Sequence, residues 1–392
     1  MSVIRSCGRS ICLVLGLTVS LVAVSLRAED VLSKAELAAR QKIDAKLDRV
    51  AELNMKNTPL KEIPAILREK QIPIVMDEEA VENSGVQLNL PFSLSFTGLV
   101  SYRAVIGLIF EQLGLTYVVG PEQITITSQT AAEKLLETRE YDLKPLLALS
   151  KEGEKLAPLI GVMTDGPWEQ TDGAGGTIEA KPNTITIRQH QPGHRQIENM
   201  LHQIQRALAP RVPPTREEAA EANWTELLNK PIDIEFTDLQ LLRVCQTVGE
   251  KNRLFFWTNG RAMSLESIDE MSLCTGSFKK TPVKKMMETV LDPLKLTYVM
   301  DHEVILVTTK KAAAKSFLIR AYALARVPKG KDPAAVIEGL HEVEDVTWED
   351  RDRTGGRVGF LGPVLIVRQS APAFEKIGPT LGEKPKPVVK TR

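Results

Sequence analysis

The chain has 392 residues, of which 43% are hydrophobic and 26% are charged. This length and composition are typical of a globular protein with several domains, and they exclude wholesale disorder. The 50 basic and 50 acidic residues cancel. A chain without a positive surplus lacks the electrostatic attraction that phosphate backbones require, so nucleic-acid binding is not expected as its main role.

The N-terminus has the pattern of a secretory signal peptide. Arg5 and Arg9 form a basic start, residues 11–26 carry no charge, and the small residue Ala28 precedes two acids. We expect residues 1–28 to be removed by cleavage after Ala28, which predicts a periplasmic or exported protein. The uncharged run is short for a membrane span, which needs about 20 apolar residues. An uncleaved N-terminal anchor remains the alternative, and it would be the only membrane contact.

Residues 29–49 predict a helix, and residues 50–130 predict a small α/β module after it. Within the module, Thr58 is expected to cap a helix that begins at Pro59, and Ser101 is expected to cap a second helix. The remaining elements are strands, and they are expected at residues 53–56, 72–76, 86–96, 115–119 and 123–127.

Residues 131–208 predict a second module with the element order βαββα. A helical connector at 131–137 leads into a strand at 139–143. The other elements are a helix at 156–163, a hairpin at 177–188 and a long helix at 194–208.

Both modules occur twice. Residues 115–143 align without a gap to residues 296–324, and identical pairs include Leu115/Leu296, Tyr117/Tyr298, Glu122/Glu303, Arg139/Arg320 and Tyr141/Tyr322. A second alignment pairs Trp168/Trp348, Gly175/Gly355, Gly176/Gly356, Arg188/Arg368 and Gln189/Gln369. The second copies are expected at 224–311 and 312–381, after a Pro- and charge-rich linker at 209–223 and before a disordered tail at 382–392. The predicted fold is α+β, a tandem duplication of a two-domain unit with four small domains.

The two modules resemble domains of outer-membrane systems. The first is similar to the short N-terminal (STN) domain of secretins and TonB-dependent receptors, through Thr-Pro-Leu at 58–60, IPIV at 72–75 and the GLTYVV and ITIT strands. The second resembles the KH-like, ring-building N-terminal repeat of secretins, through REYDL at 139–143 and NTITIRQHQPGHRQIENMLHQI from residue 183. Because the chain ends soon after Leu381, no secretin barrel is expected, and the pore function is not carried over.

The resemblance implies periplasmic modules that contact partner proteins or assemble side by side. The leading hypothesis is an exported, non-enzymatic interaction or scaffold protein of the bacterial cell envelope, whose partners are envelope proteins or further copies of itself. One alternative is an accessory factor that docks onto a secretin or a TonB-dependent outer-membrane system. The other is a ligand- or metal-binding periplasmic module.

No catalytic residue, cofactor site or metal site is predicted, because no candidate has the required spacing. The histidines at 190, 194 and 202 do not follow a metal-binding pattern. The acidic run at 341–352 lacks the tight glycine turn of calcium loops. The glycine-rich residues 172–176 lie between a tryptophan and a strand rather than before a helix, so they favour a hairpin turn over a phosphate site.

Two further pairs of residues stand out. Trp168 and Trp348 recur at matched positions and are candidate interface anchors, with packing in the core as the alternative. Cys245 and Cys274 are the cysteines that would remain after cleavage. Cys245 falls at an apolar position of a predicted helix, which favours a buried free thiol there, and a disulfide is the alternative in an exported protein.

Overall fold

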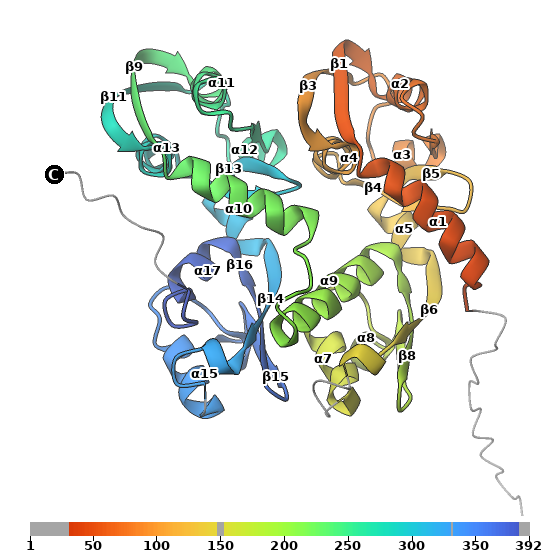
Figure 1. Ribbon diagram of the computed structural model, residues 1–392. Coiled ribbons are helices and arrows are strands. Elements are labelled where there is room, and N and C mark those ends of the chain that lie inside the picture. The colour runs from red at the N-terminus through yellow and green to blue at the C-terminus, as the bar shows by residue number, and fades with distance from the viewer. Residues whose placement is uncertain (1–30, 147–152, 331, 384–392) are drawn as a thin grey trace, which may run out of the picture.

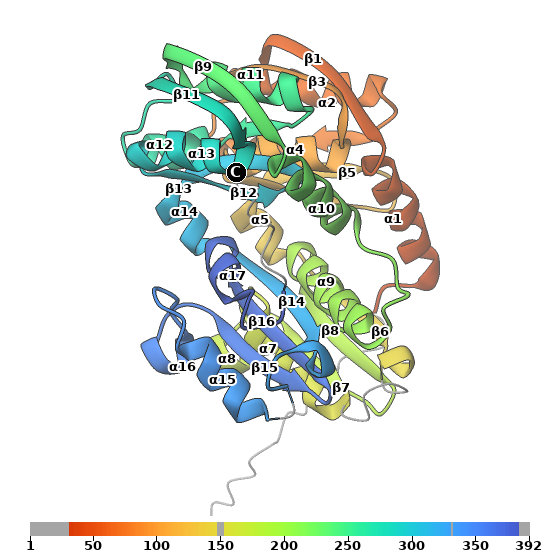
Figure 2. The same ribbon diagram turned by 60° about the vertical axis from the view of Figure 1, so that its left-hand side comes forward.

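The computed structural model describes residues 31–146, 153–330 and 332–383. The fold is α+β with several small sheets, which confirms the predicted class. Figure 1 shows two halves side by side, which we call copy 1 (residues 31–208) and copy 2 (residues 215–383). Each half has a two-stranded ribbon at one end of the molecule and a three-stranded sheet toward the other (Figures 1 and 2).

The first part of copy 1 contains two separate sheets. Its elements are α1 (Lys34–Leu47), β1 (Val50–Pro59), η2 (Leu60–Glu62), α2 (Ile63–Glu69), β2 (Ile74–Met76), α3 (Glu78–Asn83), β3 (Pro91–Ser101), α4 (Tyr102–Glu111), β4 (Leu115–Val119) and β5 (Ile124–Ser128). Strands β1 and β3 form an antiparallel ribbon. The other three strands form a sheet in the order β2-β5-β4, with β2 parallel to β5.

The second part of copy 1 is a three-stranded antiparallel sheet covered by helices. Its elements are α5 (Gln129–Lys134), β6 (Leu136–Asp142), η3 (Gly153–Lys155), α7 (Leu156–Met163), α8 (Glu169–Asp172), β7 (Thr177–Ala180), β8 (Thr184–His190) and α9 (Gln191–Leu208). The strand order is β6-β8-β7.

Copy 2 repeats these sheets as β11-β9, β10-β13-β12 and β14-β16-β15. Its first elements are α10 (Arg216–Leu228), β9 (Pro231–Gln240), α11 (Leu241–Asn252), β10 (Phe256–Thr258), α12 (Gly260–Leu265), β11 (Leu273–Pro282), α13 (Val283–Leu291), η4 (Asp292–Leu294), β12 (Leu296–Asp301) and β13 (Val304–Thr309). The remaining elements are α14 (Lys310–Lys315), β14 (Phe317–Ala323), η5 (Leu324–Arg326), α15 (Pro333–His341), α16 (Glu349–Asp352), β15 (Arg357–Leu361), β16 (Val364–Ser370) and α17 (Ala371–Ile377).

The predicted cap at Thr58 and Pro59 is wrong, because both residues are still in strand β1. Thr58 pairs with Phe92 and Pro59 with Pro91 in the ribbon. The short 3₁₀ helix that follows has no side-chain cap. A long-range strand pairing therefore outweighs a local capping signal here. The cap at Ser101 is confirmed, since its side chain accepts a hydrogen bond from the backbone N–H of Ala104.

Several predicted boundaries are shifted. The alternating strand expected at 86–96 begins only at Pro91, because residues 86–90 form a loop whose Leu88 and Leu90 carbonyls accept from the backbone of η2. The connector helix ends at Lys134 rather than residue 137, so β6 starts earlier than predicted, and α9 starts at Gln191. In each case the periodic pattern identified the element but not where its hydrogen bonds begin.

The predicted linker at 209–223 is wrong over most of its length, because helix α10 begins at Arg216. Thr215 and Glu218 form a reciprocal capping box, the Thr-x-x-Glu signal for a helix start. Trp224 and Leu228 on this helix are buried in the core of copy 2. The helix is thus a packed element of copy 2 that matches α1 of copy 1, and it leaves a short connection between the copies.

The apolar cores do not stop at the boundary between the copies. One cluster joins helices α1 and α4 of copy 1 to Val299, Val304 and Leu306 of copy 2. Another joins α7 and α9 of copy 1 to Leu361, Val364 and Ile366 of copy 2. The two copies therefore share buried surface at two places.

The chain termini are only partly described. The predicted cleavage site after Ala28 and most of the predicted tail lie outside the described residues. Glu383, within the expected disordered tail, accepts a hydrogen bond from the Tyr322 hydroxyl at 2.8 Å. In the part of the chain that is described, no helix combines the length and apolar character needed to cross a membrane.

Candidate functional site

Helix α4 lies between the three-stranded sheets of both copies. All residues from Ala104 to Phe110 are buried, including those on the side that faces away from the sheet of copy 1. That side packs on Val299, Val304 and Leu306, which point to the outer face of the copy 2 sheet. A helix that is apolar on all sides needs two partners, and α4 finds the second one in copy 2.

A tight turn of copy 2 enters copy 1 beside this helix. The turn joins β12 to β13, and we call residues 301–304 the inter-copy turn. Its two central residues, His302 and Glu303, have φ angles of 47° and 59°. Both positive angles are typical of type I′ hairpins, where Asn and Gly are usual. Larger side chains in this backbone region cost stability, so their presence points to contacts that offset the cost.

The Glu303 side chain makes the first of these contacts. It is 8% exposed, and its carboxylate accepts hydrogen bonds from the Ser101 backbone N–H at 3.0 Å and the Ser101 hydroxyl at 2.7 Å. Arg216 forms an ion pair with it at 2.8 Å, and the Trp224 indole N–H donates to its backbone carbonyl at 2.8 Å. A carboxylate at the first turn of α4 also interacts favourably with the helix dipole.

The His302 side chain makes the second contact. Its ring lies against Gly107 of α4, and a Cβ atom at that position would clash with the ring. Its two nitrogens lie 2.9 Å from Asp301 and 3.1 Å from Glu111. Burial alone would lower the pKa of His302, but these carboxylates raise its pKa well above the usual value. The ring is therefore a cation that links two acids from different copies.

The copies make a second contact at the other end of the molecule, where α7 and α9 cover the outer face of the sheet β14-β16-β15 (Figures 1 and 2). Gly359 allows the close approach, since a Cβ there would lie 2.6 Å from Leu159 and 2.9 Å from Met163. Two arginines of copy 2 bind copy 1 at the edge. Arg368 pairs with Asp165, and Arg357 donates to the carbonyl of Val162.

An open cavity of about 560 Å³ lies between these two contacts, walled by α9, α10, β14 and the inter-copy turn. Its arginines each have a carboxylate partner. Arg206 pairs with Glu218, Arg320 with Glu221 at 2.6 Å, and Arg368 with Asp165. Each of these ion pairs thus joins two segments of the cavity wall.

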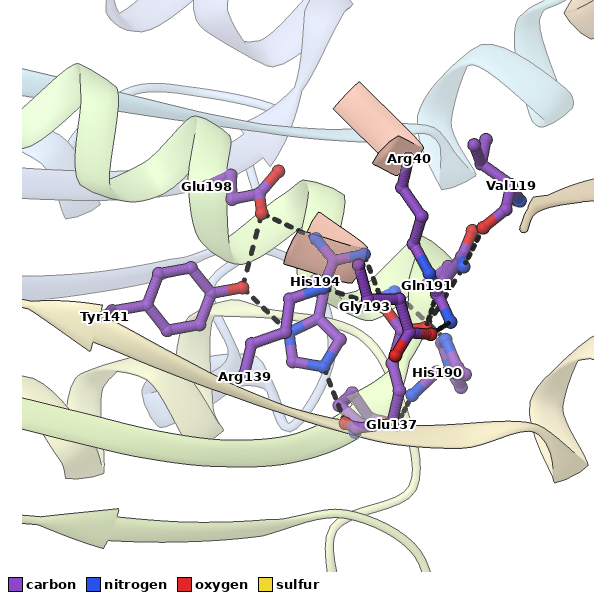
Figure 3. A network of polar contacts seen from close by, with 12 residues as sticks. Arg40, Val119, Glu137, Arg139, Tyr141, His190, Gln191, Gly193, His194 and Glu198 are labelled. Carbon is purple, nitrogen blue, oxygen red and sulfur yellow. Dashed lines mark hydrogen bonds and ion pairs between the residues drawn. The ribbon is translucent and has the colours of Figure 1, made fainter. Parts of the chain in front are cut away.

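Within copy 1, a polar network fixes the joint between the two modules (Figure 3). The Gln191 side chain is 3% exposed and bonds both backbone groups of Val119, with the N–H at 2.8 Å and the carbonyl at 2.9 Å. The side-chain amide thus makes the two hydrogen bonds that the backbone of a neighbouring strand would make at the end of β4. Gln191 also donates to Glu137 at 3.1 Å, which accepts further bonds from Arg40 and Arg139. Burial alone would raise the pKa of Glu137, and these donors lower it.

A buried histidine completes the joint. His194 is fully buried, with Nδ1 2.8 Å from the Tyr141 hydroxyl and Nε2 2.9 Å from the Glu137 carbonyl (Figure 3). The carbonyl is only an acceptor, so Nε2 donates to it and Nδ1 accepts from the tyrosine. Burial lowers the pKa of His194 to about 4. The ring is therefore neutral, and it fastens β6 to α9.

The two candidate interface tryptophans lie inside their modules. Trp168 is 4% exposed and Trp348 is fully buried, so neither indole faces a partner, and core packing accounts for both. Each backbone N–H donates to an aspartate four residues later, Asp172 or Asp352, at 2.8 Å. The paired glycines of the repeat permit the close chain crossing beside each tryptophan: a Cβ at Gly175 would clash with the Pro167 carbonyl. The recurring Trp-Gly-Gly pattern is thus a packing motif.

The other sequence candidates have intramolecular roles. His190 caps α9 by accepting from the Gly193 N–H at 2.9 Å. In the acidic run, Asp352 holds Trp348 and Glu349 pairs with Arg357. Residues 172–176 end helix α8 and enter β7, rather than forming the expected hairpin turn. Across the described ranges, no group of three or more metal-binding side chains converges on one point.

Cys245 and Cys274 are free and buried in the core of copy 2. Burial raises the pKa of the Cys245 thiol to about 12. Burial also raises the pKa of Cys274, so both thiols are protonated at neutral pH and are poor nucleophiles. The buried free thiol predicted at Cys245 is confirmed.

The contact between the copies was missed at the sequence level, although two signals were present. Helix α4 has apolar residues on every side, whereas its counterpart α13 has a charged side. Strand β16 is a continuous apolar run, Val364–Val367, whereas β8 alternates with threonine. Continuous apolar runs predict burial on both faces.

Comparisons with known proteins give a weak structural likeness. No protein-family model matches the chain, and no curated protein matches it. Among solved structures, the N-terminal domain of the secretin XcpQ from Pseudomonas aeruginosa is 12% identical, covers 83% of this chain and 95% of that one, and has a TM-score of 0.17. The GspC-GspD complex of enterotoxigenic Escherichia coli, from the type II secretion system, is 17% identical and covers 41% of this chain and 99% of that one, with a TM-score of 0.14.

A third match is the Klebsiella pneumoniae type II secretion system outer-membrane complex of PulD, PulS and the PulC HR domain. It is 12% identical and covers 84% of this chain and 49% of that one, with a TM-score of 0.21. At these identities and TM-scores the likeness carries no argument about function.

Proposed function

We propose that this chain is an exported, non-enzymatic scaffold or interaction protein of the bacterial cell envelope, built from secretin-like periplasmic modules. The observation that carries the proposal is a pair of two-stranded ribbons, β1-β3 and β9-β11, at the same end of the molecule (Figures 1 and 2). The inter-copy turn and the shared cores hold the two ribbons at one spacing.

Each ribbon offers backbone groups to a partner. A sheet of two strands has two edges, and each edge strand presents a row of N–H and carbonyl groups that an extended peptide can pair with. The edges are interrupted: Asn57 and Asp238 have positive φ angles of 50° and 47° at matched bulges. Bulges break the regular edge and disfavour long, unselective pairing. The ribbons therefore suit short extended segments of specific partners.

Site-specific photo-crosslinking in the native cell envelope tests the proposal. A photoreactive residue would replace Lys56 on β1 or Glu235 on β9, both exposed ribbon positions, and Lys181, exposed beyond β7 in the other part of copy 1, serves as the matched control. We expect discrete crosslinked envelope proteins from the ribbon positions and none from Lys181. An identical product pattern from all three positions, or no product from the ribbons, would contradict a ribbon-based scaffold.

The identity of a captured partner separates the scaffold from the accessory role. A secretin or TonB-dependent receptor would assign the chain as an accessory of that outer-membrane system. Other envelope proteins, captured without such a pore, would assign it as a free scaffold.

A further inference from the structure

We infer that the contact between the two copies is complete within one chain and does not repeat from chain to chain. The inference goes beyond the proposed function, because it concerns the number of chains rather than the partner. The contact uses helices of copy 1 and outer sheet faces of copy 2, so it joins two different surfaces. A head-to-tail contact of this kind can repeat from chain to chain. It would build rings or filaments if the sheets of copy 1 and the helices of copy 2 carried the same contact surfaces.

The contact surface of helix α4 is not repeated on its counterpart in copy 2, helix α13. The residues of α13 that match the contact residues of α4 are polar or charged, and none of them offers the same fit. The matched pairs, copy 1 first, are Ala104/Lys285, Gly107/Glu288, Leu108/Thr289 and Glu111/Asp292. Glu288 fills the position where the ring of His302 needs a glycine. Ser101 is matched by Pro282, which has no N–H to offer a carboxylate.

The apolar outer faces of the copy 2 sheets are not repeated on the matching sheets of copy 1. At most positions where copy 2 has an apolar residue or a glycine on the covered face, copy 1 has a polar one; Val299, which is matched by Val118, is an exception. The pairs, copy 1 first, are Gln123/Val304, Thr125/Leu306, Thr138/Ile319, Glu140/Ala321, Glu179/Gly359, Lys181/Leu361, Thr184/Val364 and Thr186/Ile366. The side-chain period of a strand puts each set on one face. A terminal repeat with a polar outer face is the usual end of a repeat array.

Chain segments also occupy the outer ends. Val31 bridges Thr138 on the open edge of β6, and the Leu32 N–H donates to the Thr138 carbonyl at 3.0 Å. At the other end, α17 has 7 residues where α9 has 18. A shortened helix cannot cover a neighbouring sheet as α9 covers β14.

One element of the contact does survive at both ends. Arg188 and Asp345 match the interface pair Arg368 and Asp165. Asp345 already pairs with Lys376 at 3.0 Å. An exposed ion pair contributes little by itself, so it does not replace the lost apolar surface. These four positions give a matched experiment.

The experiment compares two double-cysteine variants of the whole chain, treated with a short bismaleimide crosslinker at high protein concentration. Asp165→Cys with Arg368→Cys reports the contact within a chain, and Arg188→Cys with Asp345→Cys reports the same contact between chains. The chain without added cysteines is the control for its four native cysteines, of which Cys245 and Cys274 are buried.

We expect the first variant to be crosslinked internally in nearly every chain and to migrate as a monomer. We expect the second variant to give no products larger than one chain, and sedimentation equilibrium to give the mass of one chain at every concentration. A ladder of dimers and longer products from the second variant overturns the inference. Failure of the first variant to crosslink overturns the contact itself. Neither result depends on capture of a partner, so it is independent of the ribbon experiment.

Discussion

Replacement of Glu303 by glutamine tests whether the inter-copy turn holds the copies together. The change keeps the shape of the side chain but removes its charge and one acceptor oxygen. In the chain, one carboxylate oxygen accepts from the Ser101 N–H and the other from the Ser101 hydroxyl. An amide accepts through one oxygen only, so its oxygen would face the Ser101 N–H and its NH₂ group would donate to the Ser101 hydroxyl, which can accept as well as donate.

The expected loss follows from these two bonds. Hydrogen bonds to charged groups contribute about 1.5–3 kcal/mol each, and neutral ones about 0.5–1.5 kcal/mol. Both bonds become neutral, which lowers the stability of the contact by about 2–3 kcal/mol. Loss of the ion pair with Arg216 adds little to this loss of stability, because the Arg216 side chain is 42% exposed and solvent screens the pair.

Urea unfolding and hydrogen exchange measure the effect. E303Q should lower the free energy of unfolding and speed amide exchange at the start of α4, near Ser101 and Ala104. Glu122→Gln is the matched control, because Glu122 occupies the same position of the repeat in copy 1 and is exposed. Its effect should stay within about 0.5 kcal/mol. Equal effects of the two variants would refute the role of the turn.

Three further predictions follow from the same contacts. Gly107→Ala should destabilise the chain by about 1–3 kcal/mol, because the added methyl group overpacks against His302. Gly161→Ala should instead stabilise the chain by about 0.4–1 kcal/mol, because the nearest neighbour of the added Cβ is 3.9 Å away. Urea unfolding measures both changes. Trp348→Ala should cost about 3–5 kcal/mol, since the indole is fully buried, and a loss below about 1 kcal/mol would contradict a core role. The two histidines predict opposite pH slopes in unfolding series. The raised pKa of His302 gives a contribution that is complete below about pH 6.5 and is lost as the pH rises through its folded pKa. The pKa of His194, lowered to about 4, makes stability fall as the pH drops from 6.5 toward 4. His302→Gln should reduce only the alkaline slope and His194→Gln only the acidic one, to which His190, whose pKa is also lowered by burial, still contributes.

Much of the fold was predictable because its signals are local. The Ser101 cap, helix α7 and the hairpin of β7 and β8 follow from residues within a few positions of one another, and all are present. The errors at Thr58 and in the linker have different causes. At Thr58 a strand pairing with Phe92 outweighs the cap. At Thr215 the capping box was present in the sequence but was masked by the neighbouring prolines and charges.

The site was less predictable than the fold. Trp168 and Trp348 drew attention because they recur, yet recurrence in a duplicated chain also preserves packing, and both are buried. Some residues that join the copies, such as Gly107 and His302, do not recur, because each contact uses a different surface of each copy. Glu303 and Arg368 do recur, but recurrence alone does not distinguish a contact residue from a core residue.

The sequence by itself determined the duplication, the α+β class and the order of elements, because hydrophobic period, caps and turns act over short distances along the chain. Only the tertiary structure decided which surfaces meet. Ser101 and Glu303 lie 202 positions apart, and the local sequence around either residue does not predict that the two are in contact. Burial on two sides depends on where a second copy packs, and that placement is settled by the fit of whole surfaces rather than by any one segment.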